Sequence, residues 1–166
     1  MRLVMYSREI AHRRYVHHGS LEVPATAEES YEIAKAYLCK DTLERQLFYR
    51  LEHAHSRDYT LSINDRNDDH YDPNSNTIAW DPYSALRTTS GGRQSPALGL
   101  GHEIDHAVEN ARTADRLRNT PDSKFDTAEE HRVIMGSEAH AARTLGEGVR
   151  RDHGGNTYRV ASPIAR

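Results

Sequence analysis

The stretch SPALGLGHEIDHAVEN, residues 95–110, decides the fold because it joins a helix start to a histidine-glutamate-histidine pattern. Ser95 can cap free backbone N–H groups, and Pro96 suits the first position of a helix. At about 100° per residue, one side of this helix is apolar and the two histidines fall roughly opposite. The apolar side consists of Leu100, Ile104, Ala107 and Val108. The stretch therefore predicts a helix with one side packed on a core and the other side carrying chemistry.

The two histidines, His102 and His106, are four residues apart, so their side chains stand one helical turn apart on the same side. Both imidazoles can therefore reach one zinc ion at about 2.0–2.1 Å. Glu103 lies one position round the helix, where it can hold a water beside the metal and take its proton. The pattern predicts a zinc site with Glu103 as general base. The alternative is a surface helix with two solvated histidines.

The chain contains eleven histidines, which raises the chance that this spacing is accidental, so the neighbouring residues matter. Gly99 and Gly101 lower the helix propensity of the stretch. Gly99 lies near the histidine side, and we expect it to allow the close approach of another element.

A catalytic zinc needs a third protein ligand and an open position. The downstream candidates are Glu129, Glu130, Glu138, His140, Glu147 and His153. Glu129 and Glu130 open the next predicted helix, whose first turn would meet the ion if the two helices run antiparallel. A capping box explains the same residues locally. The possible capping pairs are Thr127 with Glu130 and Asp126 with Glu129, and spacing does not choose among these roles.

The rest of the chain alternates helical and strand patterns. The predicted elements are helices at 25–41 and 42–55, strands at 58–65, 76–83 and 157–160, a loop at 66–76 and a polar connector at 112–126. Residues 127–148 are expected to form either one long helix or two helices broken at Gly136 and Ser137. Thr26 is the expected N-cap of the first helix, with Glu29 three residues on. The first two strands are expected to form a hairpin. We predict one α+β domain, with a helical N-terminal part at 1–55 and a catalytic core at 56–166.

Composition narrows the partners of this chain. It has 166 residues, with 22 Lys and Arg against 25 Asp and Glu, and a net charge of −3. No basic stripe stands out, so nucleic acid is not an expected partner. No apolar run reaches the length of a membrane span, and residues 1–15 do not resemble a secretory signal. The single cysteine, Cys39, excludes an intramolecular disulfide.

Three separated blocks resemble the zinc-metallopeptidase toxin domains of bacteria. The blocks are NTIAWDPYSAL, SPALGLGHEIDHA and EEHRVIMGSEAHAARTLGEGVRRDHGGNTYRVASP. Such domains occur at the C-terminal ends of type VI secretion spike (VgrG) and Rhs-type proteins, and they are distantly similar to NleD-like effector metallopeptidases. The resemblance covers roughly residues 59–163 and is specific because the blocks occur in the right order.

This resemblance implies a zincin-like fold, in which a small antiparallel sheet packs on the HExxH helix and a ligand-bearing helix follows. The family's two histidines map onto His102 and His106, and its catalytic glutamate maps onto Glu103. Its third ligand maps onto Glu130, with Glu129 in reserve. The implied cofactor is one Zn²⁺ per chain.

In such folds an edge strand before the zinc helix pairs with extended substrate, and residues 77–80, TIAW, occupy that place in the sequence. We expect Trp80 to anchor the sheet against the zinc helix. Asp105 is less usual in this motif and is expected to face solvent or to support a ligand. Arg132 is expected either to orient a ligand carboxylate or to lie exposed on its helix.

Two tail residues, Tyr158 and His153, are candidate hydrogen-bond donors to the oxyanion of a tetrahedral intermediate. The alternative for both is packing or exposure to solvent. Glu138 and Glu147 are expected to form ion pairs with arginines of the same region. The arginines in question are Arg143, Arg150 and Arg151.

The expected function is zinc-dependent hydrolysis of a peptide bond, and the resemblance implies that the protein is a secreted bacterial effector toxin. Such a protein is cytoplasmic in the producer and is then injected by a specialised secretion system. The expected partners are a protein or peptide substrate, a cognate immunity protein, and a secretion spike or carrier. Two alternatives remain: an amidase acting on cell-wall peptide, and a non-catalytic binding module. In the binding module the zinc is structural, and its site is closed by His131, His140 or His153.

Overall fold

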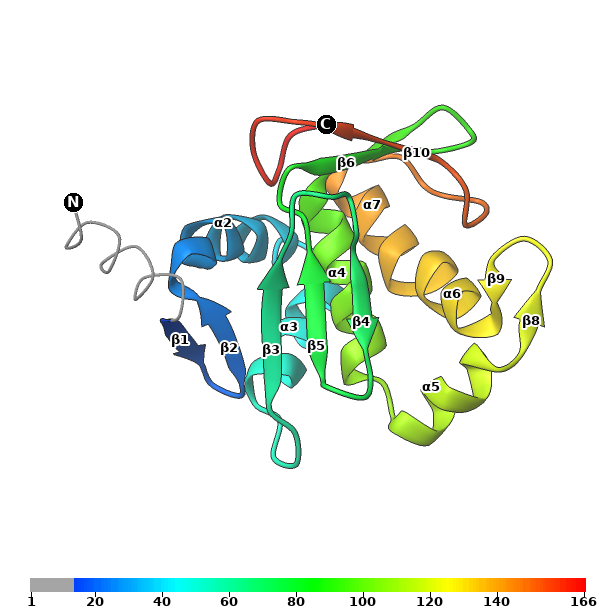
Figure 1. Ribbon diagram of the computed structural model, residues 1–166. Helices are drawn as coiled ribbons and strands as arrows, with labels where there is room; N and C mark the ends of the chain where they lie inside the picture. The colour runs from blue at the N-terminus through cyan, green and yellow to red at the C-terminus, as the bar shows by residue number, and fades with distance from the viewer. Residues whose placement is uncertain (1–13) are drawn as a thin grey trace.

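The predicted helix forms as α4, Pro96–Val108, in a computed structural model that describes residues 14–166 (Figure 1). It begins as expected, because Ser95 Oγ accepts the N–H of Leu98 at 3.3 Å and Pro96 occupies the first turn. Every residue of α4 except Gly99 is buried, so both sides of the helix are covered. The absence of a secretory signal was expected from residues 1–15, most of which lie outside the described range.

A five-stranded mixed sheet lies beside α4. Its strands in spatial order are β1 (Tyr15–His18), β2 (Leu21–Pro24), β3 (Tyr59–Ile63), β5 (Thr77–Trp80) and β4 (His70–Asp72). The three central strands run parallel, and an antiparallel strand flanks them on each edge. The α+β class is confirmed, and this sheet is mixed where an antiparallel one was expected.

The position of β5 corrects two further expectations. The chain leaves β3, forms the short strand β4 inside the predicted loop at 66–76, and turns back through Asn76, whose φ is 52°. It returns as β5 in the gap between β3 and β4, parallel to β3. Residues 77–80 therefore form an interior strand rather than an edge strand or a hairpin with β3. Their apolar side chains explain this, because an interior strand is covered on both faces.

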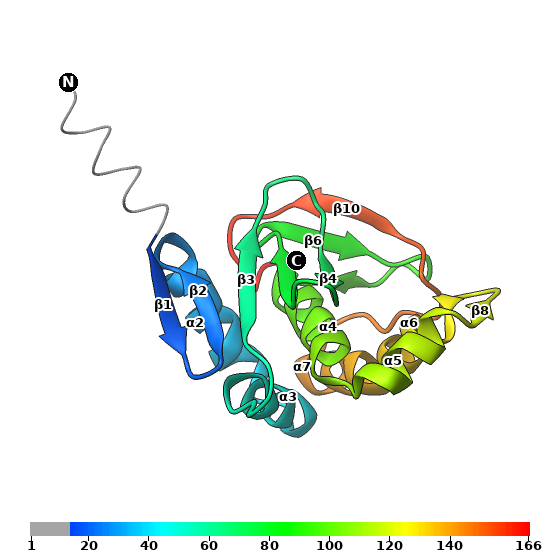
Figure 2. The ribbon, with the colours of Figure 1, turned by 60° about the horizontal axis from the view of Figure 1, so that its bottom comes forward.

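Helices α2 (Glu28–Leu38), α3 (Thr42–Glu52) and α4 pack on one side of this sheet, as the two views agree (Figures 1 and 2). The core between them includes Tyr31, Phe48, Leu61, Ile78, Trp80 and Ile104, all nearly or fully inaccessible to solvent. Trp80 anchors the sheet on α4 as expected, since its Nε1 donates to the carbonyl oxygen of Pro96 at 2.9 Å. Burial of this apolar surface is what holds the two layers together.

The N-terminal part is less helical than predicted, because β1 and β2 precede its helices. Thr26 does not cap a helix; it lies in a 3-10 turn, η1 (Ala25–Ala27), and α2 begins after it without a side-chain cap. The cap of α3 is Asp41, whose Oδ2 accepts the N–H of Glu44 at 3.0 Å.

The remaining elements are β6 (Ser84–Arg87), β7 (Arg93–Gln94), α5 (Ala111–Arg118), β8 (Pro121–Asp122), β9 (Asp126–Thr127), α6 (Ala128–Val133), η2 (Ile134–Glu138), α7 (Ala139–Leu145) and β10 (Asn156–Arg159). Among these elements, β6, α6 and η2 contact α4. The predicted polar connector at 112–126 instead holds α5 and the β8–β9 hairpin. The break at Gly136 is confirmed by its non-helical φ and ψ of −100° and −109°, and the strand predicted at 157–160 forms as β10. Within residues 14–166, no helix has the length and apolar character needed to cross a bilayer.

Candidate metal centre and catalytic site

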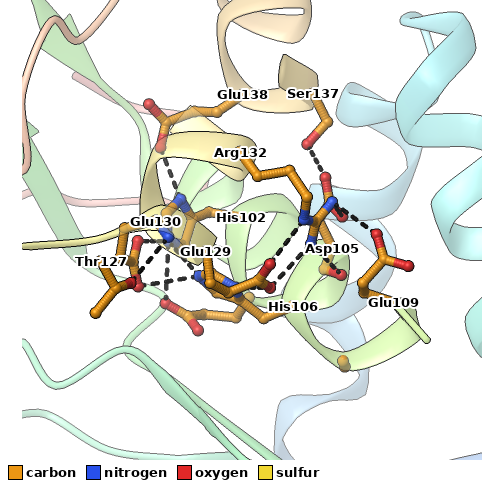
Figure 3. Close-up of polar contacts among 12 residues, drawn as sticks. His102, Asp105, His106, Glu109, Thr127, Glu129, Glu130, Arg132, Ser137 and Glu138 are labelled. Atoms are coloured by element: carbon orange, nitrogen blue, oxygen red, sulfur yellow. Dashed lines mark hydrogen bonds and ion pairs between the residues drawn. The ribbon is translucent and has the colours of Figure 1, made fainter. Parts of the chain in front are cut away.

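The two histidines of α4 are buried and point to one place (Figure 3). Their Nε2 atoms lie 3.0 Å apart. Nδ1 of His102 lies 2.9 Å from Glu138, and Nδ1 of His106 lies 2.8 Å from Glu129. Since an ionised carboxylate only accepts hydrogen bonds, each Nδ1–H is the donor, and the two Nε2 atoms are turned toward each other, where each offers a lone pair when it carries no proton. The surface helix with solvated histidines is therefore wrong.

Glu130 completes this group from the first turn of α6. Its Oε2 lies 2.9 Å from Nε2 of His102, and its Oε1 lies 3.1 Å from Nε2 of His106. The backbone N–H of Glu130 donates to Thr127 Oγ1 at 3.2 Å, so Thr127 is the N-cap while the Glu130 carboxylate reaches the histidines. Glu129 lies behind His106 instead. Capping at Thr127 therefore uses only the backbone of Glu130 and leaves the Glu130 side chain available as a ligand.

These three side chains fit a metal ion such as zinc. Two nitrogens at zinc-ligand distance from one tetrahedral ion lie about 3.3 Å apart, close to the separation of the two Nε2 atoms. Oε2 of Glu130 is buried yet makes no aligned hydrogen bond, although it faces His102. Three electron-pair donors that face one another repel unless a cation, either a metal ion or a proton, lies among them. Two imidazoles and one carboxylate are a donor set that zinc accepts.

Among residues 14–166, the side chains whose donor atoms converge at this place are those of His102, His106 and Glu130. We call these three the metal group. His131 pairs with Asp122 and His140 with Asp41, so neither joins the group. Three protein ligands leave a coordination position for water or substrate, which is the pattern of catalytic rather than structural zinc sites.

The surrounding charges favour a cation in this place. Burial lowers the pKa of His102, but the neighbouring carboxylates of Glu130 and Glu138 outweigh burial and raise the pKa to about 10. Burial raises the pKa of Glu138, but its hydrogen bonds with His102 and Arg150 outweigh burial and lower the pKa to about 2. The glutamates therefore remain ionised, and protons compete with a metal ion for the histidines.

Two arginines hold the glutamates that support the histidines. Arg150 Nε donates to Glu138 at 3.0 Å, and Arg132 Nε donates to Glu129 at 2.7 Å. Arg132 thus orients a carboxylate, although that carboxylate belongs to Glu129 and not to Glu130. Asp105 is buried and accepts from Arg132 at 2.7 Å, so of its two expected positions it takes the one behind the histidines and does not face solvent (Figure 3).

The pairing expected for Glu138 is confirmed by Arg150. Glu147 mainly holds the start of α4, because its Oε1 accepts the N–H of Ser95 at 2.6 Å. Its ion pair is with Arg166, 3.9 Å away, which the sequence did not suggest.

A cavity of about 410 Å³ opens beside the group and is lined by both histidines, Glu130 and Glu103. Glu103 is buried, and its Oε1 lies 3.8 Å from Nε2 of His102. A carboxylate in this position can accept a proton from a molecule held at the cavity end of the three donors.

The two candidate oxyanion donors fare differently. His153 lines the cavity, with Nε2 3.6 Å from Oε2 of Glu130. Tyr158 does not line it; its neighbour Thr157 does, and side chains alternate along β10. The Tyr158 hydroxyl is instead buried and has no hydrogen-bond partner among the described residues. Placing Tyr158 at the site was therefore wrong.

Sequence reasoning missed Asp69, which also lines the cavity. It belongs to the segment between β3 and β4, and its Oδ1 accepts the N–H of Asp81 at 2.7 Å. Gly99 makes room for it, because a Cβ there would lie 2.6 Å from Oδ2 of Asp69. Burial raises the pKa of Asp69 to about 8. The glycine correctly indicated a close approach, but nothing in the sequence named the residue that approaches.

The fold and the site together define an α+β protein with a candidate three-donor metal centre and a carboxylate beside it. Comparisons with protein-family models, curated proteins and solved structures find no match to this chain.

Proposed function

We propose that this protein is a zinc-dependent hydrolase of peptide bonds with a zincin-like site. The observation that carries the proposal is the meeting of His102 Nε2, His106 Nε2 and the Glu130 carboxylate at one end of an open cavity. Zinc held by these residues would polarise the scissile carbonyl and lower the pKa of a water molecule.

The chain's own residues then perform the proton transfers. Glu103 takes a proton from the attacking water and passes it to the leaving amine. His153 lies on the cavity wall, where an N–H can donate to the oxygen that becomes negatively charged. Glu129 and Glu138 keep the Nδ1 proton on each histidine, so that both Nε2 atoms stay available.

An extended peptide suits this site because an edge strand lies at the cavity. β4 is the last strand of its sheet, and His70 and Tyr71 both line the cavity. The free edge of β4 offers backbone groups with which a substrate strand can pair. β4 thus takes the role that residues 77–80 were expected to play.

The proposed biological role is that of an injected bacterial effector toxin with a cognate immunity protein. It rests on the resemblance of residues 59–163 to toxin metallopeptidases. The proposal includes delivery by a secretion spike or carrier.

The test compares the wild-type chain with Glu103→Gln for zinc content, cleavage of unfolded protein substrates and toxicity on expression in target cells. We expect about one zinc per chain in both proteins, with cleavage and toxicity lost only in the variant. Glu29→Gln, which changes an exposed glutamate of α2, is the matched control and should behave as wild type. Undiminished cleavage by Glu103→Gln would contradict the proposal.

The same preparations separate the two alternatives. Release of peptide from purified cell wall without cleavage of protein would identify a cell-wall amidase. Bound zinc with no cleavage of either substrate, and toxicity unchanged in Glu103→Gln, would identify a binding module.

A further inference from the structure

A second cavity, of about 530 Å³, adjoins the first. Arg118, Tyr71 and His106 line both. The second cavity is lined by residues of α5, of the C-terminal end of α4 and of the turn that joins β4 to β5. We call it the arginine cavity because three arginines line it: Arg57, Arg112 and Arg118.

Arg118 differs from the other arginines around the metal group. Arg132 and Arg150 are both paired with glutamates. Arg118 is half-buried at the last position of α5, and among residues 14–166 its guanidinium has neither an ion-pair nor a hydrogen-bond partner. A guanidinium carries five N–H donors in a planar fork, so its donors at the junction of the two cavities are free for a ligand.

The balance of charge in the arginine cavity is positive. Arg57 donates to the carbonyl oxygens of Ala107 and Glu109, so no carboxylate neutralises it there. The Glu109 carboxylate is already engaged, since Oε2 lies 3.3 Å from Arg132 and Oε1 accepts the N–H of Asn110. Asp115 is the one other acidic residue of the lining. A carboxylate is therefore the ligand that these side chains favour.

The course of a bound peptide leads to this place. A strand paired with β4 would pass the metal group and leave the sheet beyond Asp72. Pro73 and Asn74, which follow β4, line the arginine cavity. A peptide residue near the scissile bond would then come within reach of Arg118.

We propose that the arginine cavity is a carboxylate-binding subsite for the peptide substrate, in which Arg118 forms the charge-assisted hydrogen bonds. The carboxylate belongs either to an Asp or Glu side chain near the cut or to the substrate's C-terminus. This inference rests on the proposed peptidase function and names its substrate class. A hydrogen bond to a charged group makes a difference of roughly 10- to 100-fold in affinity.

The test is a peptide library digested by the zinc-loaded chain, with cut positions read by mass spectrometry. We expect Asp and Glu to be enriched at one fixed position from the cut. Arg118→Gln should remove this enrichment, and Arg118→Glu should replace it with Lys and Arg. Arg116→Gln is the matched control, because Arg116 is an exposed arginine of the same helix that lines neither cavity. Its cut profile should equal that of the wild type.

A binding measurement separates this inference from catalysis. Fluorescent peptides with Glu or Gln at the enriched position are titrated into Glu103→Gln, with and without Arg118→Gln. We expect Glu to bind roughly 10- to 100-fold more tightly than Gln only while Arg118 is present. Cuts clustered next to free C-termini, and lost on amidation, would identify the C-terminal carboxylate as the ligand.

The outcomes distinguish the two proposals. Cleavage without any carboxylate preference, or a preference kept by Arg118→Gln, would overturn the subsite and leave the peptidase standing. No cleavage and no peptide binding by a zinc-loaded chain would overturn the peptidase and the subsite together. Equal zinc content and equal melting temperature in the Arg118 variants are required before either comparison is made.

Discussion

Glu129→Gln is expected to weaken zinc binding although Glu129 is not one of the three converging donors. Its carboxylate accepts the Nδ1–H of His106 at 2.8 Å and thereby fixes the ring and increases the basicity of Nε2. Glutamine preserves the shape of the side chain and an accepting oxygen but removes the charge. The variant therefore tests electrostatic support of the ligand rather than packing.

The size of the effect follows from these contacts. Removal of such a supporting partner costs about 10- to 100-fold in metal affinity. Arg132 already shares the Glu129 charge, with N–O distances of 2.7 and 2.9 Å. We therefore expect a loss nearer 10-fold, or about 1.4 kcal/mol. Glu130→Gln removes a proposed ligand and should cost more than Glu129→Gln.

The assay is competition for zinc between the protein and a chromophoric chelator at neutral pH. Glu109→Gln is the matched control, because Glu109 also contacts Arg132, at 3.3 Å, but no histidine. It should bind zinc as the wild type does. Equal affinity in wild type and Glu129→Gln, or an equal loss in Glu109→Gln, would refute the reasoning.

Three further predictions concern stability. A ligand at 100 times its Kd stabilises a folded chain by about 2.7 kcal/mol, so removing zinc with a chelator should lower the melting temperature by roughly 5–10 °C. Calorimetry should show no such shift for His102→Ala, which lacks one proposed ligand. Gly101→Ala should lower the free energy of unfolding by about 1–3 kcal/mol, because the new Cβ would lie 2.6 Å from the buried Glu44 carboxylate. In a Glu44→Ala background the same substitution should raise it by up to about 1 kcal/mol, because alanine favours a helix more than glycine does. Urea unfolding that gives the same sign in both backgrounds would contradict this prediction. The pKa of Asp69 is raised to about 8 in the folded chain and is about 4 in the unfolded chain, so the stability that Asp69 contributes is complete below pH 4 and is lost as the pH rises to 8. Between pH 5 and 8 the free energy of unfolding of the wild type should therefore fall by up to about 4 kcal/mol more than that of Asp69→Asn. Urea unfolding measures both, and equal losses in the two proteins would contradict the raised pKa.

Local signals gave the parts of the site that lie within one element. The serine and proline at 95 and 96 begin α4 because a cap acts on backbone groups only a few residues away. The spacing of His102 and His106 places both rings on one side, since a helix repeats every 3.6 residues. The break at Gly136 could also be predicted from the sequence, because it depends on the backbone conformation of a single residue.

The order of the strands in the sheet could not be predicted from the sequence. A strand pattern such as TIAW states that residues 77–80 are extended and apolar, but it does not state which strand they join. The short strand β4 lies in a polar, turn-rich stretch, and only its hydrogen bonds with β5 reveal it. Edge and interior positions are decided by pairings between distant segments, which local propensity does not encode.

The sequence by itself determined helix α4, the spacing of its two histidines and the glutamate beside them. Only the tertiary structure decided which of two adjacent glutamates meets the histidines, that Glu138 and Glu129 support the rings, and that an unpaired Arg118 adjoins them. The physical reason is distance along the chain. Helical geometry fixes neighbours within a turn, whereas these contacts join residues that are brought together only when the core of the sheet and α4 is buried.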